Sequence, residues 1–340
     1  MSRPPRTTRP ALAVTIAVPI AVAVLAAGVV VSLHVGSRML PPDVVWEALT
    51  RPSADDPDHA IVTARVARTV LALLAGGALG LAGAAMQGLT RNPLGDPGIL
   101  GVNAGAALGM VLAVAVVGVT SLPVQIWFAL AGAAVAGVAV HAIAGLGRDG
   151  ATPVKLAVAG AAATAGFTSW TTALLITDLQ TLETFRFWQV GTVGGRGLEV
   201  VGPVLPFLAV GTVLALTGAR LLDVLALGDD LARGLGRRAG LDRVVVGASI
   251  ILLAGAATAL AGPIAFVGLV APHASRILVG PSYVRILPMS VALGSGLVVW
   301  ADVLGRVVLP PTEVQVGIMT AVIGVPVFFA LVRRGRMGSL

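Results

Sequence analysis

Long apolar runs without charge recur from one end of the chain to the other. A helix of about 20 residues crosses roughly 30 Å of hydrocarbon, and ten runs approach or exceed that length. Apolar and polar positions do not alternate within them, which argues against a membrane β-barrel. The pattern therefore predicts an all-α polytopic membrane protein with about ten transmembrane helices. In chain order these spans cover residues 11–33, 69–89, 99–119, 124–146, 156–177, 200–219, 244–262, 264–278, 286–305 and 314–332, the eighth being short and set off by Gly262-Pro263.

Composition agrees with a membrane protein. Of the 340 residues, 56% are hydrophobic and 11% are charged, whereas soluble domains carry roughly 25% charged residues. The first run follows three arginines at positions 3, 6 and 9, as a signal peptide would. It is longer than a usual signal-peptide core and ends in a poor cleavage site, Ser32-Leu33-His34, so we expect a retained span. Cysteine is absent, which excludes disulfides and thiolate metal sites.

The distribution of basic residues predicts the orientation. With ten spans and a cytoplasmic N-terminus, the cytoplasmic loops and tails carry 16 of the 23 basic residues, as the positive-inside rule requires. We therefore expect both tails, residues 1–10 and 333–340, in the cytoplasm. The net charge of +7 then needs no nucleic acid, because a cytoplasmic face beside anionic lipid accounts for it.

Two segments of the chain repeat. LLAGGALGLAG at residues 73–83 and LLAGAATALAG at residues 252–262 are identical at eight of eleven positions. The same offset aligns Pro93 with Pro272 and Gly101 with Gly280. The copies begin five spans apart, so spans 2–5 and 7–10 would form an inverted repeat. Inverted repeats build transporters, with the pathway between the copies.

The spans contain few groups that could couple transport to an ion gradient. Ion-coupled carriers usually bury acids within the membrane, and here Asp302 lies near one end of span nine. A phosphate-binding loop requires a lysine after glycine, and Lys155 follows Val154. We therefore expect no ATPase activity in this chain and energy supplied by a separate ATPase. An ion-coupled secondary transporter remains an alternative; a membrane enzyme would need a catalytic cluster, which we do not find.

A partner ATPase needs a cytoplasmic surface to bind, and residues 225–238 supply a candidate. Three leucines recur every four residues on one stripe, with acids at the start of the segment and arginines at its end, as the helix dipole favours. Such a helix could lie in a groove of a partner or rest on the bilayer surface. The residues expected in coupling are Leu227, Gly228, Asp229, Leu231, Ala232, Leu235 and Gly236.

Several stretches together resemble the FecCD family of permeases. They are RNPLGDPGILGVNAGA (residues 91–106), LGDDLARGLG (227–236), FVGLVAPHASR (266–276), the 302–317 stretch and IGVPVF (323–328). The resemblance covers nearly the whole chain from Arg65 onward, with the motifs in family order. The sequence departs from the family at RVAR (residues 65–68), at Glu313-Val314-Gln315 and at PSYVR (residues 281–285).

The resemblance implies a function and partners. Members of this family are membrane permeases of ATP-binding-cassette importers for ferric siderophores, haem or cobalamin, and siderophores are the cargo we expect here. The implied partners are a second permease (the same chain or a paralogue), two ATPase subunits that hold ATP and magnesium, and an extracytoplasmic solute-binding protein. The chain itself is expected to bind no cofactor and to reside in the cell membrane.

Three arginines near the outer ends of the spans are candidates for docking the binding protein. Arg65 and Arg68 precede span two, and Arg306 follows span nine, so the topology puts all three outside, against the positive-inside trend. Their placement resembles family positions that receive acidic residues of the binding protein. The alternative is a solvated or lipid-headgroup role.

The polar stretch between spans two and three is predicted to be a cytoplasmic turn. Pro93 and Pro97 stop a helix, and Asn92 can satisfy freed backbone groups. Plain turn chemistry is one interpretation; the other is that this turn and its repeat counterpart frame the cytoplasmic mouth of the pathway. The mouth candidates are Asn92, Pro93, Asp96, Pro97, Pro272, His273 and Arg276, with His273 expected to bond at a helix end rather than to bind metal.

Span five is rich in hydroxyl residues and could line the pathway. The candidates are Thr164, Ser169, Thr171 and Thr172. The alternative is that these hydroxyls bond the preceding helical turn.

Overall fold

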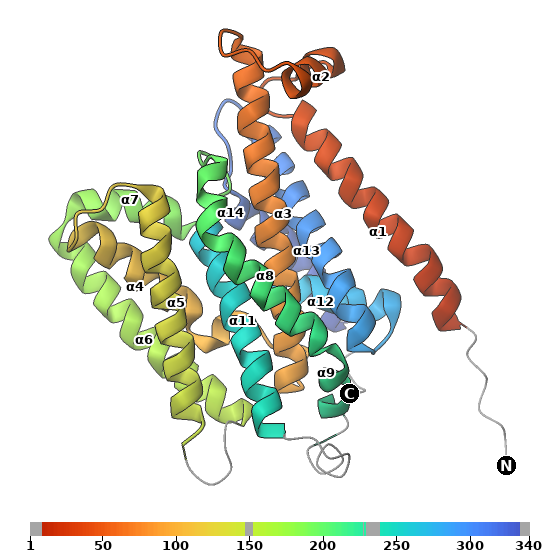
Figure 1. Ribbon diagram of the computed structural model, residues 1–340, viewed down its shortest axis with the longest axis vertical. Helices are drawn as coiled ribbons and strands as arrows, with labels where there is room; N and C mark the ends of the chain where they lie inside the picture. The colour runs from red at the N-terminus through yellow and green to blue at the C-terminus, as the bar shows by residue number, and fades with distance from the viewer. Residues whose placement is uncertain (1–8, 147–151, 227, 229–238, 334–340) are drawn as a thin grey trace.

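The computed structural model describes residues 9–146, 152–226, 228 and 239–333, and within these ranges the regular structure is entirely helical. The helices form one bundle (Figure 1). In chain order they are α1 (Arg9–His34), α2 (Pro42–Thr50), α3 (Pro57–Thr90), η1 (Pro97–Leu100), α4 (Val102–Ala115), α5 (Leu122–Ala144), α6 (Pro153–Thr177), α7 (Leu179–Gln189), η2 (Leu198–Val200), α8 (Val201–Thr217), α9 (Ala219–Ala226), α11 (Ala239–Ala261), α12 (Val267–Val279), α13 (Tyr283–Val307) and α14 (Val316–Arg333).

Each of the ten predicted spans corresponds to a helix of the bundle, namely α1, α3, α4, α5, α6, α8, α11, α12, α13 and α14. Among the described residues, six helical stretches are long and apolar enough to cross a membrane, and α4, α12 and most of α14 form shorter apolar helices. The all-α polytopic fold predicted from the apolar runs is therefore confirmed.

Two predicted boundaries were wrong, and both concern arginines. We expected span two to begin after Arg68, but α3 begins at Pro57, where Asp56 accepts a hydrogen bond from the Asp58 N–H and caps the helix. Arg306 lies inside α13 rather than after it. Charge ends an apolar run in the sequence, but it does not end a helix whose charged side chains find partners inside the protein.

Short helices that the apolar pattern did not predict cover the ends of the bundle. α2 packs Val45 and Ala48 against Val62 of α3, and α7 buries Phe185 and Trp188. α9 lies at the opposite end of the molecule from α2 (Figure 1). We refer to these two ends as the α2 end and the α9 end. The N-terminal end of α1 and the C-terminal end of α14 both lie toward the α9 end (Figure 1).

The sequence repeat corresponds to two similar units. α3 and α11 carry the repeated segments and run in opposite directions (Figure 1). Each is followed by an irregular segment and then by a short helix, α4 of 14 residues or α12 of 13 residues. Helices of that length span only about 20 Å, so irregular backbone completes each crossing, which membranes tolerate where protein covers it.

The extension of the repeat beyond the matched segments was wrong at the level of local structure. Pro93 lies in a turn, whereas Pro272 lies inside α12. Gly101 begins α4 with φ +71°, whereas Gly280 ends α12 with φ +83°. The repeat therefore holds for the long helices and their breaks rather than residue by residue.

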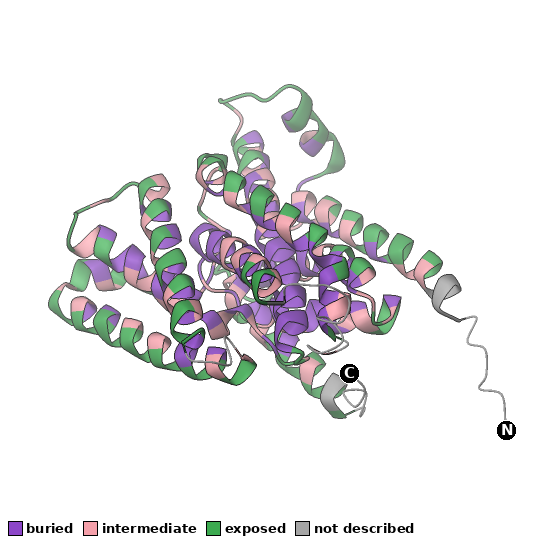
Figure 2. Cartoon of the chain, turned by 60° about the horizontal axis from the view of Figure 1, so that its bottom comes forward, coloured by how far each residue is buried: buried purple, intermediate pink, exposed green. Residues whose placement is uncertain are grey.

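Small residues bring the central helices into close contact. Buried positions concentrate along α3, α11 and α13, while α1 and α6 expose much of their surface (Figure 2). A Cβ added at Gly83 of α3 would collide with the Gly268 carbonyl of α12, and one at Gly76 with the Gly294 carbonyl of α13. Backbones approach at these points because no side chain separates them, as in other membrane helix pairs.

Candidate functional site

A large groove opens at the α2 end of the bundle. Its volume is about 950 Å³, and it lies between the α1–α2 and α2–α3 connections, the first turns of α3 and the 195–199 segment. Most of its charged lining is basic. The arginines are Arg38, Arg65, Arg68, Arg196 and Arg306, and the acids are Glu199 and Glu313. The three arginines singled out in the sequence therefore share one groove.

Arg65 joins the end of α1 to α3. Its side chain is buried, and Nη1 donates to the carbonyl oxygens of Leu33 and His34, both at 2.9 Å. These are carbonyls at the C-terminal end of α1, which lack partners within the helix, and a cation there is also favoured by the helix dipole. Arg65 thus acts as a cap for α1 contributed by a neighbouring helix.

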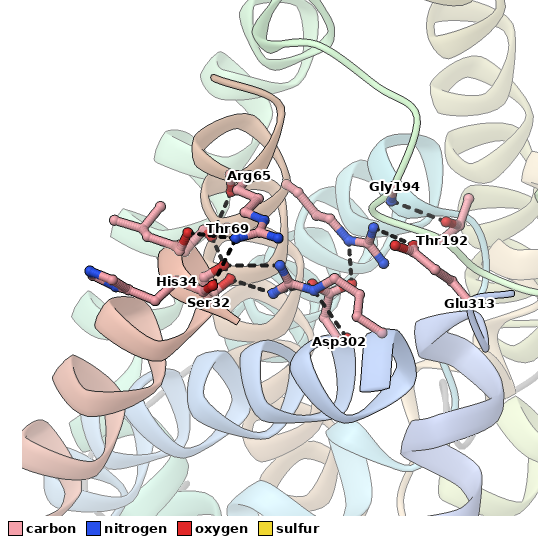
Figure 3. A network of polar contacts seen from close by, with 11 residues as sticks. Ser32, His34, Arg65, Thr69, Thr192, Gly194, Asp302 and Glu313 are labelled. Atoms are coloured by element: carbon pink, nitrogen blue, oxygen red, sulfur yellow. Dashed lines mark hydrogen bonds and ion pairs between the residues drawn. The ribbon is translucent and has the colours of Figure 1, made fainter. Parts of the chain in front are cut away.

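Arg68 and Arg306 flank the buried carboxylate of Asp302, which is labelled in Figure 3. Asp302 is 1% exposed; Arg68 Nε donates to its Oδ1 at 2.7 Å, and Arg306 Nη2 lies 3.1 Å from its Oδ2. Arg68 also binds Glu313 at 2.6 Å. Arg306, 2% exposed, donates to the Ser32 carbonyl at 2.9 Å and the Ser32 hydroxyl at 2.7 Å. This network ties α1, α3, α13 and the loop before α14 together.

Arg196 caps another helix from the opposite wall of the groove. Its guanidinium donates to the Leu260 carbonyl near the C-terminal end of α11. Burial lowers the pKa of Arg196 to about 10, so the side chain still carries its charge at neutral pH. Arg38, by contrast, is 61% exposed and pairs with Asp58 at 2.9 Å. The groove therefore has a buried, internally bonded floor of arginines, and Arg38 and Glu199 are exposed at its rim.

Sequence reasoning found the three arginines but missed their partners. Asp302 had been noted only for its place near a span end, and Glu313 and Ser32 had no assigned role. A signal existed, since Asp302 and Arg306 are four residues apart and such pairs face each other on a helix. The contacts of Arg68 with Glu313 and of Arg306 with Ser32 join distant segments and had no local signature.

The turn after α3 is exposed at Asn92 and Leu94 and packs against the bundle from Gly95 onward. Asn92 accepts a hydrogen bond from the Leu94 N–H at 2.9 Å, which confirms its predicted use in the turn. Asp96 caps η1 by accepting from the Gly98 N–H at 2.8 Å. Pro97 is buried and Pro93 is half-buried. A Cβ at Gly268 would meet both Pro97 and Asp96, so this turn lies against the start of α12.

The repeat counterpart of that turn is helical. Pro272 and His273 are buried within α12, so the expectation that His273 ends a helix was wrong. Arg276 donates to the Tyr283 hydroxyl at 3.1 Å and lies over the Tyr283 ring. These residues lie on α12 and the start of α13, while Asn92 and Asp96 belong to the turn after α3.

A second cavity lies where the two breaks meet. It holds about 410 Å³ and is lined by Asp96, Asn103 and Gln189 together with residues 263–266 and Gly317. Asn103 accepts a hydrogen bond from the Thr258 hydroxyl at 2.8 Å, which links α4 to α11. α11 ends at Ala261 because Gly262 has φ +73° and Pro263 follows. The irregular backbone thus borders polar space.

Most of the predicted coupling segment lies outside the described residues, namely Leu227, Asp229, Leu231, Ala232, Leu235 and Gly236. Gly228 is described and has φ +109°. α9, which leads into the segment, is fixed to α13 through Asp223. This carboxylate accepts from the Tyr283 N–H at 2.6 Å and from the Ser282 hydroxyl at 2.9 Å. A residue that sequence reasoning overlooked therefore joins α9 to the α12–α13 turn.

The hydroxyl-rich helix α6 has a broad exposed face. A groove of about 640 Å³ runs along it, lined by small residues that include Thr164 and Ser169. Thr172 is exposed and Thr171 is buried. The Ser169 hydroxyl donates to the Ala165 carbonyl and the Thr171 hydroxyl to the Phe167 carbonyl, both at 2.8 Å. The alternative of bonding to the preceding turn is thus confirmed for these two residues.

Within the described ranges, no group of three or more histidine, aspartate or glutamate side chains could hold a metal ion. Most of the polar features instead fall into four places: the basic groove at the α2 end, the cavity between the helix breaks, the Asp223 contact at the α9 end, and the exposed face of α6.

Known proteins are similar to this chain in sequence and in architecture. The model of the FecCD transport family matches residues 23–334. The ferric enterobactin transport system permease FepD of Escherichia coli is 41% identical over 324 residues, covering 95% of this chain and 97% of that protein. The iron(3+)-hydroxamate import system permease FhuB of Bacillus subtilis is 41% identical over 316 residues, covering 92% and 82%.

A solved structure has the same fold. It is described as a metal-chelate type ABC transporter in an inward-facing conformation. The superposition gives a TM-score of 0.77 with 28% sequence identity and covers 92% of this chain and 97% of the other.

Proposed function

The chain belongs to the FecCD transport family, and from this premise we propose that it is the membrane permease of an ATP-driven importer for ferric siderophores. The proposal rests on one observation. Over nearly its full length, this chain is about 40% identical to permeases named for ferric chelates. ATP and magnesium then bind to separate ATPase subunits, and this chain forms the pathway.

The names of the relatives support a class of cargo rather than one compound. Permeases named for enterobactin, for hydroxamates and for ferric citrate are 41%, 41% and 43% identical to this chain. Their similar identities point to the shared chemistry, a ferric ion wrapped in an oxygen-rich chelator. Haem and cobalamin are the alternative cargoes.

The environment of Asp302 argues against ion-coupled transport. An ion-coupled carrier needs an acid that can bind and release the coupling ion. Asp302 is instead buried between Arg68 and Arg306. An acid held by two cations is a structural group. This favours an external energy source over a secondary transporter.

The orientation proposed from the basic residues puts the α2 end outside and the α9 end in the cytoplasm. Both termini are then cytoplasmic, and the groove faces the extracytoplasmic binding protein. We propose that Arg65, Arg68 and Arg306 form the floor of its docking site and Arg38 part of the rim. The mouth residues Asn92, Pro93, Asp96, Pro97, Pro272, His273 and Arg276 then border the inner part of the pathway.

The assembly proposed here has two permeases and two ATPases. Two ATPases must meet to enclose ATP, and one chain carries one coupling segment, residues 225–238. The exposed α6 face with Thr164, Ser169 and Thr172 would meet the second permease across the pathway, which accounts for the exposure of its small hydroxyl-bearing residues. Thr171, buried in this chain, would support that face from behind.

Uptake by proteoliposomes tests the proposed function. The chain, co-purified with its ATPase and binding protein, should import a radiolabelled ferric siderophore when ATP is enclosed with the ATPase, and ionophores should leave the rate unchanged. An ATPase variant without its phosphate-binding lysine is the control and should not transport. Uptake that needs no ATP and stops with ionophores would show a secondary transporter, and competition by haem or cobalamin alone would reassign the cargo.

The exposed Arg38 at the rim of the groove predicts a salt-dependent docking step. Arg38→Glu should weaken binding of the solute-binding protein about fivefold, because reversing one exposed charge costs about 1 kcal/mol. Arg51→Glu is the matched control, since Arg51 is exposed at the same end but does not line the groove. Surface plasmon resonance with the permease in nanodiscs, at low and high salt, measures the affinity of each variant for the binding protein. Equal affinities of the two variants, or binding indifferent to salt, would contradict docking in the groove.

A further inference from the structure

An apolar cavity lies beside α1 toward the α9 end. α1 occupies the edge of the bundle (Figure 1), and the cavity of about 260 Å³ separates its N-terminal half from the α12–α13 turn. Polar contacts from α13 to α1 occur in the other half, where Trp300 donates to the Val24 carbonyl and Arg306 to Ser32. The cavity is lined by Val14, Val18, Val22, Val279, Val284, Arg285, Pro288, Met289 and Ala292.

One charged residue, Arg285, borders this cavity. Its guanidinium lies beside Gly280, where a Cβ would be 3.2 Å from Nη2. No hydrogen bond or ion pair joins the Arg285 side chain to any other described residue. The acid bonded to this turn, Asp223 of α9, is engaged with Ser282 and Tyr283. Arg285 is in the first turn of α13, where the helix dipole disfavours a cation. No contact within the described part of the chain therefore accounts for a positive charge at this position.

We propose that this cavity binds one anionic phospholipid from the leaflet at the α9 end, with an acyl chain between α1 and α13 and the phosphate on Arg285. The valine, proline and methionine walls match hydrocarbon. An arginine at the edge of the hydrocarbon is stabilised by an anion, and basic pockets between membrane helices on this side bind anionic headgroups. A planar guanidinium also matches phosphate geometry.

A lipid explains the combination of features better than a second protein chain. A protein partner would have to present an apolar surface and a carboxylate to the same narrow space. A phospholipid carries both parts in one molecule, and it is present wherever the protein folds. The inference depends on the membrane fold and not on the cargo, so failure of either proposal leaves the other standing.

Lipid binding can be measured directly by native mass spectrometry of the detergent-solubilised protein. Titration with palmitoyl-oleoyl phosphatidylglycerol should give one retained adduct, whereas phosphatidylcholine with the same chains should bind about tenfold more weakly. Inorganic phosphate alone should not compete, because the acyl chain contributes most of the contact. Displacement of the lipid by inorganic phosphate would instead identify a simple anion site and overturn the proposal.

Three variants separate the contributions. Arg285→Gln should lower phosphatidylglycerol affinity about tenfold, to the level of phosphatidylcholine, and Val18→Trp should fill the cavity and abolish the adduct. Arg220→Gln is the matched control, because Arg220 is an exposed arginine that does not line this cavity. Each variant is first checked for an unchanged thermal unfolding temperature in a lipid-free state. Wild-type preference for phosphatidylglycerol in Arg285→Gln would overturn the proposal.

Because the chain contains no cysteine, a single introduced cysteine can test whether a second protein chain covers this face. The single-cysteine variant Val18→Cys in native membranes should not form a disulfide-linked dimer on oxidation, because lipid covers the position. Efficient crosslinking between two copies would show that a second chain covers this face, and it would overturn the lipid assignment.

Discussion

Asp302→Ala will unfold the α2 end of the protein, with a loss of about 3–5 kcal/mol in the free energy of unfolding. This loss of stability arises because the two arginines keep their positive charges after the carboxylate between them is removed. Arg306 is 2% exposed and Arg68 14% exposed, and removing Asp302 leaves the almost fully buried Arg306 without an anionic partner. Thermal and denaturant unfolding in detergent, followed by Trp fluorescence, measure the loss.

Two variants distinguish a buried ion network from simple loss of packing. Glu313→Gln removes the other acid on Arg68, but Glu313 is 39% exposed, so we expect a cost of about 0–1 kcal/mol. The double variant Asp302→Leu, Arg306→Leu removes both buried charges and leaves Arg68 its contact with Glu313. It should be more stable than Asp302→Ala alone. If the three variants lose the same stability, the network does not hold the helices together.

Ala232→Glu will abolish uptake while the permease still inserts and folds. We propose that the coupling segment places its small residues and leucines in a groove of the ATPase, where a glutamate would be buried without a partner. A defect of this kind at the centre of an interface costs about 2 kcal/mol or more, which weakens the contact about thirtyfold. Siderophore uptake and ATPase co-purification, measured together, report the result.

Ala232→Ser is the control for that experiment, because it keeps a small side chain and should transport normally. Asp223→Ala tests the contact between α9 and the α12–α13 turn. It removes the acceptor that joins α9 to the first turn of α13, so the ATPase should still bind and hydrolyse ATP while uptake falls. Normal uptake by Ala232→Glu would place the coupling contact elsewhere.

Each of the ten apolar runs falls on a helix, because about 20 uncharged residues have few structures open to them other than a membrane helix. The boundaries failed where arginines lie inside helices. Arg65, Arg68 and Arg306 have the sequence signature of loop residues, and only their long-range partners make a helical position possible. Such pairings are not visible in the local sequence, since Arg68 and Asp302 are 234 positions apart.

Some features of the candidate sites could likewise be inferred from the sequence, and others could not. Glycine and proline revealed the breaks at Arg91–Gly101 and Gly262–Phe266, because these residues have direct backbone consequences. The contact of Asp223 with Ser282 and Tyr283 could not be inferred, since an aspartate beside an amphipathic segment has many possible partners. The Arg285 cavity depends on the packing of α1, which the sequence of α1 alone does not specify.

The separation of Arg68 and Asp302 along the chain also constrains synthesis of the protein. Ribosomes add about 5–20 residues per second, so roughly 10–50 s pass between the appearance of the arginine and that of its carboxylate partner. During that interval the first helices reside in the bilayer with Arg68 unneutralised, and the side chain must remain in the watery headgroup region. Closure of the α2 end is therefore a late event in biogenesis, and a ribosome stalled before residue 302 would leave an unfinished bundle open on that side for quality-control proteases.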